Sequence, residues 1–194
     1  MDRIKEIHIY QYDLPILGPP YRFSQSTLTK LDTTLVKIIS ESGLNGFGEV
    51  CPLGNTYLPS HPEGARIALQ TIAPHLIGMN LIQTQNINYK MDLALSGHAY
   101  AKAAIDIALW DLKGKKFGVS LSNLLGGSTV EYVPSYYAIS TDSPENVAKI
   151  VKDKQAQGYP RLQIKVGGRD IEEDIAVAHK AFEARDAGIK IVLD

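Results

Sequence analysis

Alternating and β-branched residues open the chain and predict an antiparallel sheet. Residues 4–12 alternate imperfectly between apolar and polar side chains, and residues 31–40 are rich in β-branched ones, so both segments are predicted strands. Turn-forming residues fill 41–46, and residues 47–50 begin a third strand. The proline-containing segment 13–30 is predicted to be a long loop, of the kind that often serves as a lid.

Helical spacing follows a second predicted loop, residues 51–60. Ser60 is predicted to cap a helix with Pro62 in its first turn, and residues 81–95 form a second predicted helix. The clearest helix spans 98–113, where one apolar stripe joins Ala101, Ala104, Ile105, Ala108, Leu109 and Leu112. Because alanine makes up half of this stripe, we expect its packing partner to approach closely.

From residue 130 onward, predicted strands alternate with predicted helices. The strands span 130–140, 162–166 and 189–193. The first helix begins at Ser143, and the second begins with a capping box at Asp170 and Glu173. The apolar stripe predicted for the second helix comprises Ile171, Ile175, Ala178 and Phe182. This alternation predicts parallel βα units joined by right-handed crossovers.

The chain is therefore expected to have two parts, an α+β domain over residues 1–127 and two and a half βα units over residues 128–194. An open sheet of three strands buries too little apolar surface to form a domain of its own. A whole (β/α) barrel takes about 250 residues. The sequence is thus expected to be an N-terminal portion of a longer protein.

Composition excludes several classes of function. The 194 residues are 44% hydrophobic and 21% charged, with a net charge of −1 and no basic run, so nothing favours nucleic acid or a membrane surface as partner. No apolar run is long enough to span a bilayer, and the N-terminus lacks a signal-peptide core, so a cytoplasmic location is expected. The single cysteine, Cys51, is more readily a small buried apolar group than a nucleophile.

Two strand ends carry the candidate chemistry. Gln163 and Lys165 share one face of the strand that precedes Gly167-Gly168, and the following strand ends at Asp194. A lysine and a carboxylate at neighbouring strand ends are typical of a site. A structural interpretation is available for each, since Lys165 can pair with a carboxylate as a structural lysine and Asp194 can cap a helix. The pattern alone leaves the two interpretations of Lys165 equally favoured.

Three stretches resemble the mandelate racemase/muconate lactonizing enzyme branch of the enolase superfamily. They are residues 104–115 (AIDIALWDLKGK), residues 163–167 (QIKVG) and residues 192–194 (VLD), and the resemblance extends over the whole chain in order. Many relatives have Lys-x-Lys on the second barrel strand, where this chain has Gln163-x-Lys165. That variant, together with the loop 55–61, resembles the proline-betaine and hydroxyproline-betaine 2-epimerases and the cis-3-hydroxyproline dehydratases.

The resemblance implies a fold and a set of roles. Residues 1–127 would form an α+β capping or lid domain, and residues 128–194 would begin a (β/α) TIM-type barrel. Lys165 would be the acid/base at the carbon next to a carboxylate, and Asp194 would be the first of three acidic ligands to Mg²⁺. Gln163 can hydrogen-bond a substrate carboxylate. Tyr57 can offer its ring to a quaternary ammonium, although an ordinary half-buried loop tyrosine is the alternative.

The reaction implied is Mg²⁺-dependent removal of an α-proton from a small carboxylate through an enolate. The lysine must be neutral to act as base, with a pKa of about 7–8 rather than about 10.4. The outcome favoured at this stage is racemisation or 2-epimerisation of a proline-type amino acid or betaine. Dehydration of cis-3-hydroxyproline, or a muconate cycloisomerase- or acid-sugar dehydratase-type reaction, is the alternative. A noncatalytic α/β ligand-binding module is the alternative of another class, and a homo-oligomer remains open.

Overall fold

The computed structural model describes residues 2–23, 26–54 and 57–194, which fall into two compact units. The first unit comprises Met1–Pro15 and Lys30–Thr129, and the second comprises Ile16–Thr29 and Val130–Asp194. The change of unit at residue 129 lies close to the predicted division at residue 127. Segment 16–29 was assigned to the N-terminal part from the sequence, but it groups with the second unit.

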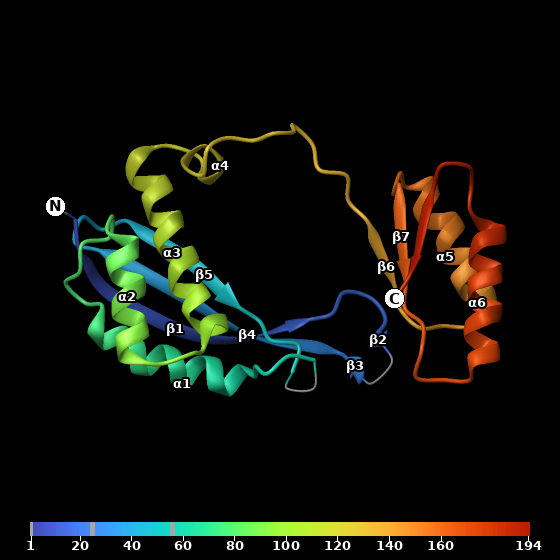
Figure 1. Cartoon of the computed structure of the whole chain (residues 1–194), viewed down its shortest axis with the longest axis horizontal. Helices are drawn as coiled ribbons and strands as arrows, with labels where there is room; N and C mark the ends of the chain where they lie inside the picture. Colours follow the sequence, from blue (N-terminus) through green and yellow to red (C-terminus); the bar gives the residue numbers. More distant parts are fainter. Residues whose placement is uncertain (1, 24–25, 55–56) are drawn as a thin grey trace. The chain divides into compact units, whose positions relative to one another are not determined.

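The first unit contains an antiparallel sheet (Figure 1). Its strands are β1 (Ile4–Pro15), β4 (Lys30–Ser40) and β5 (Asn45–Val50), in the order β1-β4-β5. Pairing between β1 and β4 continues as far as Pro15 opposite Lys30, so β1 is longer than predicted. Proline is tolerated there because β1 is an edge strand. Three antiparallel strands were expected and are confirmed.

The predicted loop 13–30 is wrong in part. Beyond the end of β1 it contains a short hairpin of two strands, β2 (Tyr21–Phe23) and β3 (Ser26–Leu28). The hairpin lies in the second unit, where the Thr141 amide donates to the Arg22 carbonyl at 3.3 Å. Proline and glycine at 15–20 obscure these strands, because each strand has only three residues and too few positions for a periodic pattern.

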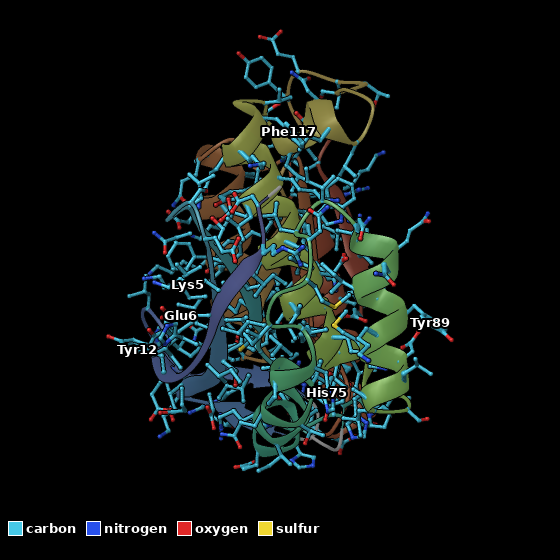
Figure 2. The ribbon with its side chains drawn as sticks, turned by 90° about the vertical axis from the view of Figure 1, so that its left-hand side faces the viewer. Lys5, Glu6, Tyr12, His75, Tyr89 and Phe117 are labelled. Carbon is cyan, nitrogen blue, oxygen red and sulfur yellow. The ribbon has the colours of Figure 1, made fainter. Side chains whose placement is uncertain are left out.

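Helices cover one face of the first sheet. Those that pack on its strands are α1 (Pro62–Ile72) and α3 (Ala99–Phe117), and the 3-10 turn η1 (Ala73–His75), α2 (Thr84–Ala94) and α4 (Leu121–Leu124) contact these helices or one another. His61 caps α1, since its Nδ1 accepts from the Gly64 amide at 3.1 Å, so the cap predicted at Ser60 is wrong by one residue. Tyr12 of β1 and Tyr89 of α2 project away from the core on opposite sides (Figure 2). None of the helices in the described part of the chain is long and apolar enough to cross a bilayer.

The alanine-rich stripe of α3 lies directly on β5. All six predicted stripe residues are buried in the core of the first unit. A Cβ on Gly48 would lie 2.0 Å from the Ala104 carbonyl oxygen, and one on Gly46 would lie 2.1 Å from that of Ala108. The close approach expected from the alanines is confirmed, and the sheet provides glycine to meet it.

The second unit contains parallel βα units, as predicted. Its strands β6 (Tyr137–Ile139), β7 (Arg161–Ile164) and β8 (Lys190–Leu193) lie in that order, with α5 (Pro144–Ala156) and α6 (Ile171–Ala184) as the connecting helices (Figure 1). The strand predicted over 130–140 is wrong for residues 130–136, which are exposed and belong to none of the strands of the described residues. A β-rich sequence forms a strand only where a neighbour accepts its hydrogen bonds.

The predicted apolar face of α6 is also wrong. Ile171, Ile175 and Phe182 are exposed, whereas the buried residues of this helix are Val177, Ala181 and Ala184. These small residues pack into the core of the second unit with Val147 and Val151 of α5. Helix α6 thus has two apolar stripes, and the one with smaller side chains faces the interior.

Candidate active site at the ends of β7 and β8

The strand ends of the second unit are aligned by continued pairing. The Lys165 amide donates to the Ile139 carbonyl at 2.9 Å, and the Val166 amide donates to the Asp194 carbonyl at 2.9 Å. The Asp194 amide in turn donates to the Ile164 carbonyl at 3.0 Å. Because the parallel ladder extends past the assigned strands, Lys165 and Asp194 are held side by side at the carboxyl edge of the sheet.

Three predicted site residues converge on one oxygen atom. Oδ2 of Asp194 accepts a hydrogen bond from Nζ of Lys165 and another from Nε2 of Gln163, the latter at 2.6 Å. The Lys165 side chain is 18% exposed and that of Asp194 is 45% exposed, so the cluster is accessible from solvent. The shared face predicted for Gln163 and Lys165 is therefore observed, and it is the face toward which Asp194 points.

These neighbours change the acidity of Asp194. The hydrogen bond from Lys165, then that from Gln163, then the positive charge of Lys165 together lower the pKa of the Asp194 carboxyl group below its usual value. Asp194 is thus a carboxylate over the whole physiological range.

The Asp194 carboxylate is suited to be one ligand of a hard metal ion such as Mg²⁺. A carboxylate oxygen is the ligand type that Mg²⁺ takes, and Asp194 is ionised and partly exposed at a strand end. The described residues contain no group of three or more His, Cys, Asp or Glu side chains that can hold a metal. Within this part of the chain, the residues present therefore account for a single carboxylate ligand.

Tyr57, the fourth predicted site residue, belongs to the first unit. It is exposed, and its amide donates to the Gly54 carbonyl at 3.3 Å. Residues 55 and 56 of the loop that resembles the relatives lie outside the described residues. Cys51, at the start of the same loop, is partly buried, and this burial raises the pKa of its thiol. A raised pKa agrees with the expectation that Cys51 is not a nucleophile.

A cluster around Arg169 was not predicted. It joins the loop after β7, the first turns of α6 and the carbonyl of Asp142 in the loop after β6. Asp170 caps α6 as predicted, since its Oδ1 accepts from the Glu172 amide at 3.3 Å, but the Glu173 carboxylate accepts from Arg169 at 3.0 Å. The capping-box pattern obscured this role, because it accounts for an acidic residue at 173 without any arginine.

The hairpin within the predicted loop 13–30 contacts the loop that follows β6. Backbone and hydroxyl contacts join the hairpin to the loop after β6, since the Arg22 amide donates to Oγ of Ser140 at 3.4 Å. A cavity of about 290 Å³ lies within the second unit at this junction, lined by Tyr21, Arg22, Tyr137, Ser140 and Asp142 among others. The sequence indicated a lid at 13–30, and the hairpin is the part of it that makes these contacts.

The observed arrangement is an α+β domain followed by parallel βα units, with a lysine and a carboxylate at neighbouring strand ends. Residues 6–126 match the family model of the mandelate racemase/muconate lactonizing enzyme N-terminal domain. The chain belongs to this family, the mandelate racemase/muconate lactonizing enzyme branch of the enolase superfamily.

Individual relatives agree with this assignment. The chain is 46% identical to a cis-3-hydroxy-L-proline dehydratase of Roseibium aggregatum, over 91% of this chain and 48% of that protein. Its structure is similar to that of an N-succinyl Arg/Lys racemase from Bacillus cereus (31% identity, TM-score 0.92, 99% of this chain and 52% of that one). It is also similar to that of an enolase-superfamily member from Roseovarius nubinhibens complexed with magnesium (37%, 0.88, 100% and 52%). The chain spans about half the length of the relatives it matches.

Proposed function

We propose that the whole protein catalyses Mg²⁺-dependent removal of the proton next to the carboxylate of a small substrate. The observation that carries this proposal is the convergence of Lys165, Gln163 and Asp194 at the carboxyl ends of β7 and β8. A lysine can take the proton, an amide can bind the substrate carboxylate, and a carboxylate can hold the metal. Functional residues of barrel-type folds gather at this end of the strands.

Each residue has a distinct role in this proposal. Lys165, in its neutral form, accepts the α-proton at Nζ, and Gln163 donates a hydrogen bond to the substrate carboxylate. Asp194 serves as one ligand of Mg²⁺, and the described residues contain no group of three or more His, Cys, Asp or Glu side chains that supplies the others. A bound Mg²⁺ supplies stabilisation of the negative charge that develops on the substrate carboxylate. Tyr57 contacts the substrate from its loop.

The first reaction to test is the dehydration of cis-3-hydroxyproline. The 46% identity to a dehydratase of this substrate supports it, although epimerisation was the favoured outcome from the sequence and dehydration the alternative. In dehydration, Lys165 takes the α-proton and the C3–O bond breaks, so that the hydroxyl leaves as water after protonation. In 2-epimerisation of a proline-type amino acid or betaine, the same enolate regains a proton on its other face.

The test is exchange of the α-proton in D₂O with Mg²⁺, using cis-3-hydroxyproline, proline betaine and hydroxyproline betaine. Replacing the base, Lys165→Ala, should slow proton abstraction on its face at least about 100-fold while the protein stays folded. Lys190→Ala is the matched control, because Lys190 is an exposed lysine of the adjacent strand β8. Wild-type exchange in the Lys165→Ala protein would refute the assignment.

Metal dependence gives a separate test of the role of Asp194. Chelation should abolish exchange, and added Mg²⁺ should restore it. Asp194→Asn keeps the size of the side chain and removes the charge, so it should raise the Mg²⁺ concentration needed for half-maximal exchange at least about tenfold. An unchanged Mg²⁺ requirement in this variant would contradict a ligand role, and binding of substrate without any exchange would favour the noncatalytic module.

A further inference from the structure

The segment after Lys165 leaves the sheet abruptly. The Val166 amide makes the last ladder hydrogen bond, to the Asp194 carbonyl just after β8, and Gly167 and Gly168 then adopt φ values of +91° and +77°. These are left-handed conformations that favour glycine. Immediately after the sheet contacts end, the Gly167 amide donates to Oδ2 of Asp174 at 2.7 Å. The strand end that carries Lys165 is thus tied to the first turns of α6 through one carboxylate.

Arg169 holds that carboxylate and reaches a second loop. Its Nε donates to Oδ1 of Asp174 at 2.6 Å, and its Nη1 donates to the Asp142 carbonyl at 2.7 Å and to Glu173 at 3.0 Å. The Arg169 side chain is only 16% exposed. One planar guanidinium therefore joins the loop after β6, the loop after β7 and the start of α6.

The second loop is itself fixed to the helix that follows it. Oδ1 of Asp142 accepts from the Ser143 amide at 2.7 Å and from Asn146 at 3.0 Å, so the Asp142 carbonyl is held in place at the start of α5. Arg169 thus connects the Gly167-Gly168 turn, which it follows directly, to a loop that is fixed by its own hydrogen bonds. A lysine cannot replace it, since an ammonium group lacks the fork that reaches both the carboxylate and the carbonyl.

We propose that Arg169 is a positioning residue that fixes the strand end carrying Lys165. The inference rests on the proposed function, because Arg169 acts through Lys165. Placement of a base matters steeply, and an error of about 1 Å can cost about 100-fold in rate. Nη2 of Arg169 is buried without a hydrogen-bond partner among the described residues.

The experiment compares Arg169→Met and Arg169→Lys with Arg185→Met in the whole protein. Arg185 is a suitable control because it also donates to a carbonyl, that of Ile189, but at the opposite end of α6. Both Arg169 variants should lower kcat for α-proton exchange on the Lys165 face about 10- to 100-fold, with KM changed less than about twofold. Amide hydrogen exchange of peptides covering 140–146 and 163–170 should become faster in Arg169→Met and stay unchanged in Arg185→Met.

Two results would overturn the proposal. One is wild-type kcat in Arg169→Met, and the other is faster amide exchange throughout the second unit, which would make the arginine a general stabiliser. If the wild-type protein exchanges no substrate proton, the proposed function fails separately. Amide exchange then decides alone, since faster exchange confined to the two peptides supports the tie between the loops and unchanged exchange overturns it.

Discussion

Gln163, two residues before Lys165 on the same face of the strand, donates to the same Asp194 oxygen as Lys165. Replacing it with leucine keeps the approximate volume and removes the donor. If Gln163 binds the substrate carboxylate, Gln163→Leu should raise KM about tenfold or more, because hydrogen bonds to charged groups contribute about 1.5–3 kcal/mol. Steady-state kinetics with cis-3-hydroxyproline and with proline betaine measure this. An unchanged KM for both substrates would exclude this role for the amide.

Asp32 and Arg66 form a two-pronged ion pair between β4 and α1 in the first unit. Nη1 lies 2.8 Å from Oδ1 and Nη2 lies 3.1 Å from Oδ2, with the two side chains 28% and 20% exposed. The hydrogen bonds from Arg66 lower the pKa of Asp32. Because the pKa is lowered in the folded state, the pair stabilises the protein above the unfolded pKa of about 3.9. That contribution is lost as the pH falls through the folded pKa.

Arg66→Met should therefore lower the free energy of unfolding by about 1 kcal/mol at pH 7, and the difference should shrink below about pH 4. Urea unfolding at pH 7 and pH 3, followed by the fluorescence of the single tryptophan, measures both values. Lys90→Met, at an exposed position of α2, provides the control. A difference that is the same at both pH values would mean that Arg66 stabilises by packing rather than through Asp32.

Helix α3 and strand β5 approach each other so closely that the strand has room only for glycine at the points of contact. A Cβ at Gly48 would overlap the Ala104 backbone, which cannot rotate away as a side chain can. Gly48→Ala should therefore destabilise the first unit by about 3 kcal/mol or more. Gly114→Ala, where a Cβ would come no nearer than 3.1 Å to the Val119 carbonyl oxygen, should change stability by about 1 kcal/mol or less. Equal losses in the two variants, measured by urea unfolding, would contradict this account.

The same elements explain what the sequence can and cannot predict. The α3 stripe was predictable because its six apolar residues, three of them alanine, follow helical spacing, and the glycines that meet them lie close together on β5. The α6 face was not, because that helix has two apolar stripes and only the packing against α5 and the sheet selects between them. Residues 130–136 have β-forming side chains but belong to none of the strands in the described part of the chain.

At the site too, arrangements set by strand geometry were predictable from the sequence, whereas contacts between distant segments were not. The shared face of Gln163 and Lys165 follows from strand geometry alone, and the nearness of Asp194 follows from parallel pairing of consecutive strands. The Arg169 cluster depends on a carbonyl 27 positions earlier in the chain, for which no spacing rule exists. Tyr57 belongs to a different compact unit, so its role remains a prediction that substrate-binding measurements on Tyr57→Phe and Tyr57→Ala have to test.

On the scale of the whole chain, the two units have separate hydrophobic cores that share no residue. Among the described residues, the first core contains 18 buried side chains and the second contains 8. The free energy of unfolding of each unit depends on the apolar area that the unit buries, and small open sheets bury little. We therefore expect the second unit to be the less stable of the two when residues 1–194 are studied as a polypeptide.

This difference can be measured because Trp110, the only tryptophan, lies on α3 in the first unit. Its fluorescence reports on the first unit alone, whereas far-UV circular dichroism reports on both. In urea, the dichroism signal should begin to fall at a lower concentration than the fluorescence signal changes. Leu162→Ala, in the second core, should shift only the earlier transition, and Leu109→Ala, in the first, only the later one, each by about 2–5 kcal/mol. Coincident transitions that respond together to either substitution would show instead that the two cores unfold as one cooperative unit.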